Sequence, residues 1–218
     1  VAKKLLLEFG INIRSYVIQI GSIKISDSTF QTLNYEEILY KTEESPVRCP
    51  DDKASQSMVE LIDKAMRKGD TLGGIFEIFV TNIPAGIGSH IQWDRRLDSR
   101  LAKALMGIQA IKGVEIGDGF SMAERFGSEV MDEIFYDNSF FYRKTNHAGG
   151  IEGGITNGMP IVIRAAIKPI PTLRKPLQSV DIISKEPFEA DYERSDVCAV
   201  PAASIIGEAM TAIVTADA

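Results

Sequence analysis

Stretches with the hydrophobic period of a strand alternate along this chain with stretches that have the period of a helix. Between Pro160 and Ile167 every second residue is aliphatic, as in a strand that buries one face. From Asp51 onward the apolar residues instead recur three and four positions apart, as in an amphipathic helix that ends at Gly69. A chain that interleaves both periods is expected to fold as layers of helices and strands around a shared core.

The remaining segments fit the same class. Helices are predicted over 1–9, 97–109 and from Pro201 onward, and strands over 11–20, 75–81 and near 113–119. Hairpin-compatible spacing argues against a purely parallel sheet, so we predict an α+β fold. The polar stretch 42–50 is predicted as loop, and 121–148 as a long ordered loop with helical pieces. The residues of the last helix expected to face the core are Ala202, Ile205, Ile206, Ala209, Met210 and Ile213.

Charge and composition argue against several classes of binding partner. The chain has 218 residues with 24 basic and 30 acidic side chains, a formal charge of −6. This balance gives no general attraction to nucleic acid or anionic membranes. The two cysteines have no metal-ligand spacing and are too few for a disulfide scaffold. With no membrane-length apolar run and no leader peptide in the sequence, we expect a cytoplasmic protein without a metal site.

Both ends of the sequence suggest a piece of something longer. Val1 already stands in a helical pattern with no capping residue before it, and the last helix stops without a C-terminal stop signal. We therefore predict that 1–218 is a single, partial domain.

Three short segments are candidates for chemistry. The first runs from Asn146 to Gly158 and holds five glycines within ten residues, which lets backbone approach a ligand closely. A set of tight turns explains the same glycines equally well. The second is Lys168–Thr172 with Arg174 and Lys175 beyond it, where prolines stiffen a backbone that carries groups able to hold a phosphate. A solvated basic loop is the alternative.

The third candidate is Arg194-Ser195-Asp196, just before the last helix. Its arginine could clamp an anion beside a carboxylate that moves protons, whereas a plain helix cap would also explain the aspartate. Together the three segments favour binding of a phosphorylated ligand, but they do not indicate which reaction is catalysed.

In sequence, these segments resemble chorismate synthase. The resemblance rests on GIQAIKGVEIGDG (107–119), TNHAGGIEGGITNG (145–158) with the downstream KPIPT, and RSDVCAVPAASIIGEAM (194–210). It implies a layered β-α-β sandwich with helices packed between mainly antiparallel sheets. It also implies a lyase that eliminates phosphate from 5-enolpyruvylshikimate 3-phosphate to give chorismate, and that requires reduced FMN. A homotetramer is implied as well, with the flavin reduced by the enzyme itself or by an external flavin reductase.

The resemblance also implies roles for single residues. Asp196 would be the acid/base group that serves the flavin ring nitrogen, and Arg194 would lie between flavin and substrate. The remaining FMN contacts would be Gln109, Ala110, Gly153, Lys168, Pro169, Ile170, Pro171 and Thr172. Many family members carry hydroxyl residues where this chain has Ile170 and Pro171, which leaves only backbone contacts there. Gln109, where many family members have Asn or a neighbouring polar residue, is a milder departure from the family pattern.

The family's Gly-Glu-Ser-His-Gly motif, its second catalytic histidine and its substrate-binding arginine cluster would all precede Val1. We therefore expect the 218-residue chain to be inactive alone, and we give His147 none of these roles. A non-catalytic flavin-binding or assembly scaffold that retains the fold is the alternative. FMN titration separates the two readings.

Overall fold

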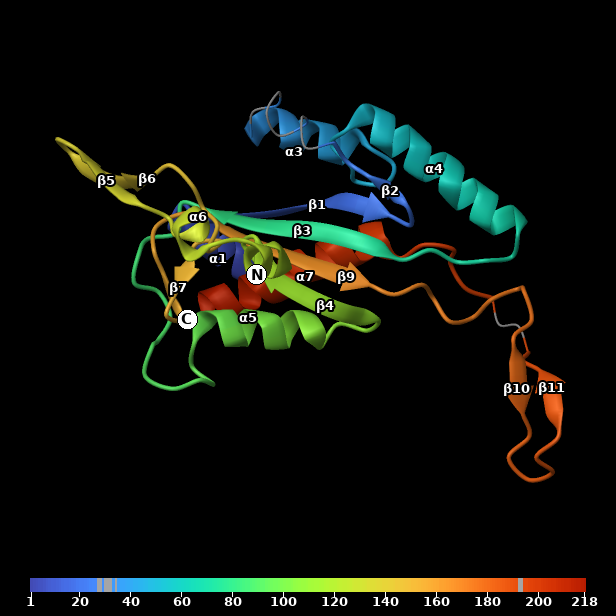
Figure 1. Ribbon diagram of the computed structural model, residues 1–218. Coiled ribbons are helices and arrows are strands. Elements are labelled where there is room, and N and C mark those ends of the chain that lie inside the picture. The colour runs from blue at the N-terminus through green and yellow to red at the C-terminus, as the bar shows by residue number, and fades with distance from the viewer. Residues whose placement is uncertain (27–28, 30–32, 34, 192–193) are drawn as a thin grey trace. The chain divides into compact units, whose positions relative to one another are not determined.

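A five-stranded sheet is the largest sheet of the computed structural model, which describes residues 1–218 except 27–28, 30–32, 34 and 192–193 (Figure 1). Its strand order is β2-β1-β3-β9-β4, so chain neighbours are mostly not sheet neighbours. The bounds are β1 Asn12–Ile20, β2 Ile23–Lys24, β3 Gly74–Thr81, β4 Ile111–Ile116 and β9 Ile161–Ile167.

The other strands form two-stranded antiparallel hairpins: β5 Ile134–Asp137 with β6 Phe140–Arg143, β7 Ile151–Glu152 with β8 Ile155–Thr156, and β10 Gln178–Val180 with β11 Pro187–Glu189. The α-helices are α1 Ala2–Glu8, α3 Tyr35–Glu44, α4 Asp52–Arg67, α5 Leu97–Met106, α6 Gly127–Val130 and α7 Val200–Ala216. A 3₁₀ turn, η1, spans Gly119–Glu124. The predicted α+β class with antiparallel sheets is confirmed.

The chain divides into two compact units. Unit 1 contains Val1–Tyr16, Phe76–Ala166 and Ala203–Ala218, and unit 2 contains Val17–Ile75 and Ile167–Ala202. The boundaries fall inside β1, β3, β9 and α7 rather than in linkers.

In unit 1, helices α5 and α7 lie on the same face of the strands, and Arg100 of α5 is paired with Asp217 at the end of α7 (Figure 1). Leu97, Leu101 and Leu105 of α5 are fully buried, as the sequence predicted. Helix α7 packs against β3 through Gly207, where an added Cβ would lie 2.7 Å from the Phe76 ring. A glycine therefore sets the distance between this helix and the sheet.

The predicted core face of α7 is wrong. The side chains that lie against unit 1 belong to the opposite face, which is rich in small and polar residues: Ala203, Ser204, Glu208, Thr211, Ala212 and Thr215. Ile205, Ile206 and Ile213 are instead about half exposed. The physical reason is specific pairing: the Glu208 carboxylate accepts hydrogen bonds from the backbone and hydroxyl of Ser15, at 2.8 and 2.9 Å, and is paired with Lys3.

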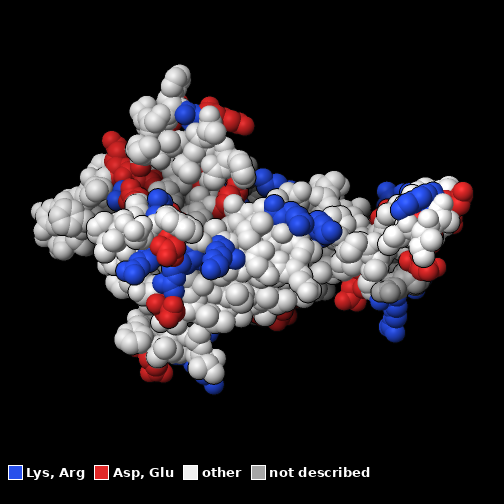
Figure 2. All heavy atoms as spheres, turned by 90° about the horizontal axis from the view of Figure 1, so that it is seen from below, with Lys and Arg blue, Asp and Glu red and all other residues white. Residues whose placement is uncertain are grey.

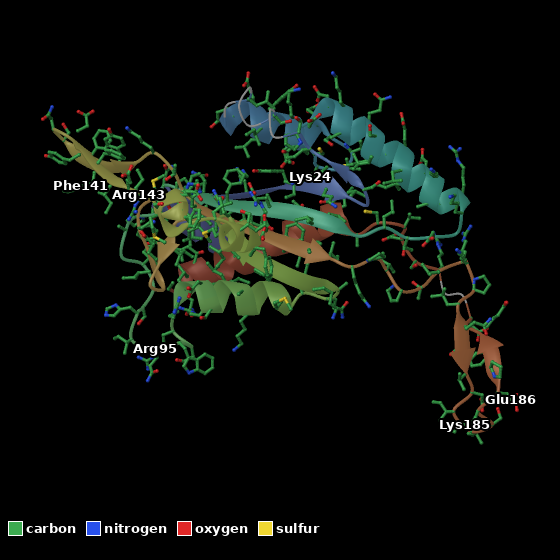
Figure 3. All side chains as sticks on the ribbon, viewed as in Figure 1. Lys24, Arg95, Phe141, Arg143, Lys185 and Glu186 are labelled. Atoms are coloured by element: carbon green, nitrogen blue, oxygen red, sulfur yellow. The ribbon has the colours of Figure 1, made fainter. Side chains whose placement is uncertain are left out.

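In unit 2, helix α4 begins where the sequence predicted, because Asp51 accepts a hydrogen bond from the Ala54 backbone at 3.0 Å. Leu61 of α4 packs at the end of β1, only 2.9 Å from where a Cβ on Gly21 would stand. The loop predicted from residue 42 starts too early, because α3 continues to Glu44. Lys185 and Glu186 lie at the tip of the β10–β11 hairpin (Figure 3).

The region 121–148 contains the predicted helical pieces, η1 and α6, but also the hairpin β5–β6, which was not predicted. Asn138 makes its turn with a φ of 43°. The hairpin bears exposed aromatic side chains such as Tyr136 and Phe140, together with Phe141, which is labelled in Figure 3. Because neither face is buried, the strands lack the alternation that would have revealed them.

The surface carries charges of both signs. On the face drawn in Figure 2, Lys and Arg side chains stand among Asp and Glu side chains. In the part of the chain that the structure describes, no helix has the length and apolar character needed to cross a bilayer.

Candidate active site

A pocket of about 240 Å³ lies in unit 2. Three segments line it: the end of α4 with the following loop, the stretch after β9, and the stretch before α7. The lining residues are Met66, Gly69, Asp70, Thr71, Thr172, Arg174, Arg194, Ser195, Asp196 and Val197. The two guanidinium groups of this small pocket, with the Thr172 hydroxyl, suit an anion. The volume is below that of typical pockets for drug-sized ligands, about 300–1,000 Å³.

Hydrogen bonds tie the three walls together. The Thr71 hydroxyl donates to the Ile170 carbonyl at 2.6 Å, and the Ser195 hydroxyl donates to the Thr172 carbonyl at 3.0 Å. The Leu72 backbone N–H donates to the Val197 carbonyl at 2.8 Å. The loop after α4 therefore contacts both of the other walls.

Gly73 shows how close these segments are. A Cβ at this position would lie 2.3 Å from the Ile167 carbonyl oxygen and 2.9 Å from the Pro169 nitrogen. Only glycine leaves room for the backbone after β9 at this distance.

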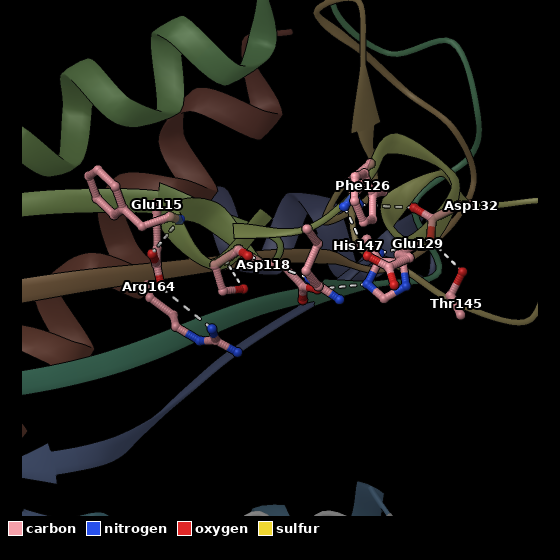
Figure 4. A network of polar contacts seen from close by, with 12 residues as sticks. Glu115, Asp118, Phe126, Glu129, Asp132, Thr145, His147 and Arg164 are labelled. Atoms are coloured by element: carbon pink, nitrogen blue, oxygen red, sulfur yellow. Dashed lines mark hydrogen bonds and ion pairs between the residues drawn. The ribbon is translucent and has the colours of Figure 1, made fainter. Parts of the chain in front are cut away.

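The glycine-rich loop of unit 1 is held by one carboxylate, Asp132. Its oxygens accept hydrogen bonds from the Thr145 hydroxyl at 2.6 Å, the His147 N–H at 2.8 Å and the Ala148 N–H at 2.9 Å (Figure 4). Burial alone would raise the pKa of Asp132, but these hydrogen bonds outweigh it and hold the pKa below its ordinary value. Asp132 therefore anchors the loop in its ionised form.

His147 is engaged by a second carboxylate. Its Nδ1 lies 2.6 Å from Asp118 Oδ2, and Arg125 is paired with the same oxygen. Burial would raise the pKa of Asp118, whereas the hydrogen bonds from Arg125 and His147 lower it, and they prevail. Because both its ring and its backbone are held by protein carboxylates, His147 has a structural explanation.

The five glycines of this loop differ in what surrounds them. A Cβ on Gly149 would lie 2.2 Å from the Gly117 nitrogen, and one on Gly150 would lie 2.5 Å from the Pro160 carbonyl oxygen. Gly154 is similarly crowded by Ser89 and Arg96. Gly153, with a φ of 60°, has no atom within 4 Å of its added Cβ. Close packing therefore explains three glycines, and Gly153 has open space beside it.

A row of polar side chains crosses four neighbouring strands of unit 1. The Tyr16 hydroxyl on β1 donates to Glu77 on β3, and Arg164 on β9 donates to Glu77 at 2.7 Å. Arg164 also donates to Glu115 on β4 at 3.4 Å (Figure 4). Burial, and then the charge of Glu77, raise the pKa of Tyr16 well above its ordinary value. This row was not predicted from the sequence, although a glutamate within the apolar strand 74–81 indicates a buried charge.

Comparison with known proteins identifies the family. The chorismate synthase family model matches residues 1–218. The chain belongs to the chorismate synthase family. It is 58% identical to the chorismate synthase of Desulforamulus reducens over 212 residues, 97% of this chain and 54% of that protein. It is 54% identical to that of Geobacillus sp. strain WCH70 over 219 residues, 100% of this chain and 56% of that protein.

A solved crystal structure of chorismate synthase aligns with a TM-score of 0.81 and 48% identity, covering 100% of this chain and 59% of that one. The chain thus spans about half the length of the curated chorismate synthases that it matches.

The residues predicted from the chorismate synthase resemblance fall in both units. Thr172, Arg194 and Asp196 line the pocket of unit 2, and Ile170 contributes its carbonyl to the wall. Lys168, Pro169 and Pro171 are exposed in the same segment. In unit 1, Gln109 and Gly153 are exposed and Ala110 turns the chain with a φ of 68°. That the two groups converge on one ligand stays a prediction.

Asp70, Thr71 and Gly73 were not predicted as site residues from the sequence. The structure places all three where the walls of the pocket meet. The available signal was the run GDTLGG at 69–74, two polar residues between glycines just before a buried strand.

Proposed function

We propose that the complete protein is a lyase that converts 5-enolpyruvylshikimate 3-phosphate to chorismate and phosphate in the cytoplasm. The observation that carries this proposal is the pocket of unit 2, where Thr172, Arg194 and Asp196 meet in a chain of the chorismate synthase family. Two arginines supply the positive charge that a phosphorylated ligand needs on a protein of net charge −6.

The donor set of this pocket fits reduced FMN at its phosphate-bearing side. Arg174 and the hydroxyl of Thr172 are groups that hold phosphate oxygens, and a pocket of this size can enclose one end of the cofactor. Lys168 and the backbone of Pro169, Ile170 and Pro171 would extend the contact. Bound reduced FMN would supply electron density as the substrate phosphate leaves.

Asp196 and Arg194 are assigned complementary roles. Within the described part of the chain, neither side chain makes a hydrogen bond or an ion pair, and both line the pocket. Asp196 would take up and return a proton at its carboxylate oxygens, where the flavin ring nitrogen is the partner. Arg194 would stabilise negative charge between flavin and substrate, because a guanidinium is a planar cation that donates several hydrogen bonds.

Gln109, Ala110 and Gly153 of unit 1 would complete the FMN site. Gly153 supports this role because open space adjoins its backbone, and Gln109 because its side chain is exposed.

We further propose that 1–218 is part of a single domain with the layered β-α-β sandwich fold. The half-exposed isoleucines of α7 support this, because a second sheet packed on them would place the helix between two sheets. The relatives are long enough to supply it, since the chain covers only 54% of the Desulforamulus reducens protein. A homotetramer, with flavin reduced by the enzyme or by an external reductase, is the expected setting.

The test uses the complete protein with single substitutions and measures chorismate formation. Asp196→Asn should lower kcat by about 100-fold or more, the usual size of a lost proton-transfer group. Asp191→Asn, an exposed aspartate outside the pocket, is the matched control. Unchanged turnover in Asp196→Asn would remove the acid/base assignment.

Arg194→Ala should raise the FMN dissociation constant or the substrate KM by about tenfold or more, since a charged hydrogen bond to a phosphate is lost. Arg67→Ala, an exposed arginine of α4 that does not line the pocket, is its control. If neither constant changes, Arg194 is not the clamp.

The 218-residue chain alone should form no chorismate, and detectable product would refute that expectation. FMN titration of this chain distinguishes the two candidate functions. Tight binding indicates a partial enzyme, and no binding indicates an assembly scaffold.

A further inference from the structure

We propose that Thr71 is a positioning residue that fixes the Lys168–Thr172 segment as one wall of the anion pocket. The inference rests on the proposed FMN site and adds a residue to it. Thr71 comes from a different part of the chain, 99 residues before the carbonyl to which it is bonded. Its side chain therefore joins two walls that the backbone alone does not connect.

The geometry separates positioning from direct binding. Thr71 is only 9% exposed, and its hydroxyl proton is directed to the Ile170 carbonyl oxygen at 2.6 Å. A hydroxyl has one proton to donate. While that bond exists, Thr71 cannot donate to a phosphate in the pocket that it lines.

The segment needs such a support because of its composition. Pro169 and Pro171 have no backbone N–H, so this stretch has few donors with which to bond neighbouring backbone. Its carbonyl groups are what remains, and hydroxyls hold two of them: Thr71 bonds Ile170, and Ser195 bonds Thr172. The segment is thus held from both adjoining walls.

The backbone around Thr71 is itself fixed. Gly69 accepts a hydrogen bond from the Lys175 N–H at 3.1 Å, and Leu72 donates to Val197. Gly73 lies in close contact with Ile167 and Pro169, as its missing Cβ shows. Thr71 therefore presents its hydroxyl from a rigid support, which is what accurate placement of a phosphate-binding wall requires.

The experiment compares Thr71→Val and Thr71→Ser in the complete protein by FMN titration, with kcat measured at saturating FMN. Valine keeps the branched shape and loses the hydroxyl, whereas serine keeps the hydroxyl. We expect valine to raise the FMN dissociation constant about tenfold, which corresponds to about 1.4 kcal/mol. Serine should restore it to within about twofold, and kcat should stay within about twofold in both.

Thr42→Val in α3 is the matched control. Thr42 is also buried in unit 2, but its hydroxyl has no hydrogen-bond partner in the described residues. Its valine variant should bind FMN like the wild type. Thr71→Ala serves as a second hydroxyl-free variant, with the same expected loss, in case valine prevents folding.

The outcomes separate the two levels of the proposal. A valine variant that melts earlier but binds FMN like the wild type would show a purely structural role and overturn the inference, while the proposed function stands. A serine variant as weak as valine would also overturn it, because shape rather than the hydroxyl would then matter. A wild-type protein that binds no FMN would refute the proposed cofactor site itself.

Discussion

The polar groups of unit 1 and those of the unit 2 pocket differ in how fully they are bonded. Around the glycine-rich loop, Asp118 and Asp132 each accept hydrogen bonds from two or more protein donors, and Glu77 is bonded by both Tyr16 and Arg164. In the pocket, Arg194 and Asp196 make no side-chain bond within the described residues. A hydrogen-bond network in which every charged group has a protein partner stabilises the fold. Charged side chains that line a pocket and have no protein partner are instead available to bind a ligand.

The glycines give the sharpest way to test this difference. Gly149→Ala places a Cβ against the backbone of Gly117 at a φ of 63°. The left-handed backbone and the overpacking together should cost about 2–5 kcal/mol. Urea denaturation of the variant measures this loss.

Gly153→Ala is the matched comparison, because it has a similar φ of 60° but open space around the new methyl. It should cost only about 1–2 kcal/mol and should weaken FMN binding. Equal losses of stability in the two variants would mean that crowding does not distinguish packing glycines from a ligand-facing one.

Glu77→Ala tests the row of polar side chains. It leaves the Tyr16 hydroxyl and the Arg164 guanidinium without their shared acceptor in a buried setting. We expect a loss of about 3 kcal/mol, at the low end for a broken buried pair because a third of the Arg164 side chain reaches water. Glu124→Ala, an exposed glutamate of η1, should change the melting temperature little. A mild effect of Glu77→Ala would show that water replaces the pair.

Much of the fold could be predicted because local signals agreed with it. Asp51 caps α4, alternating residues form β9, and the leucines of α5 are buried as their spacing required. The predicted face of α7 is wrong because the most hydrophobic side chains of this helix do not contact the sheet. Gly207 and Glu208 instead bring the small and polar face inward, and that choice depends on Ser15 and Lys3, which lie far away in sequence.

The candidate site could be predicted only in part from the sequence, because some of its contacts also join residues far apart in the chain. Arg194, Asp196 and Thr172 belong to segments with recognisable motifs, and the structure brings them to one pocket. Thr71 belongs to no such motif. Its role arises from a bond to Ile170, and no pattern of nearby residues predicts a partner 99 positions away.

Asp132→Asn probes the anchor of the glycine-rich loop. The folded-state pKa of Asp132 is lowered below the unfolded value of about 3.9. Its stabilisation is therefore present above that unfolded value and is lost as pH falls through the folded pKa. The asparagine variant should lose about 1–2 kcal/mol at neutral pH. Its stability should also fall less steeply below about pH 4, while Asp118 keeps part of the slope.

The smallest effect on stability is expected in the pocket itself. Arg194→Ala and Asp196→Asn remove exposed groups that bond nothing in the described residues, so each should shift the free energy of unfolding by less than about 0.5 kcal/mol. Urea denaturation of both variants without FMN measures this directly. The same two substitutions are expected to impair FMN binding or turnover strongly. A large loss of stability in either variant would mean that its side chain supports the fold, and the contrast between the two regions would then fail.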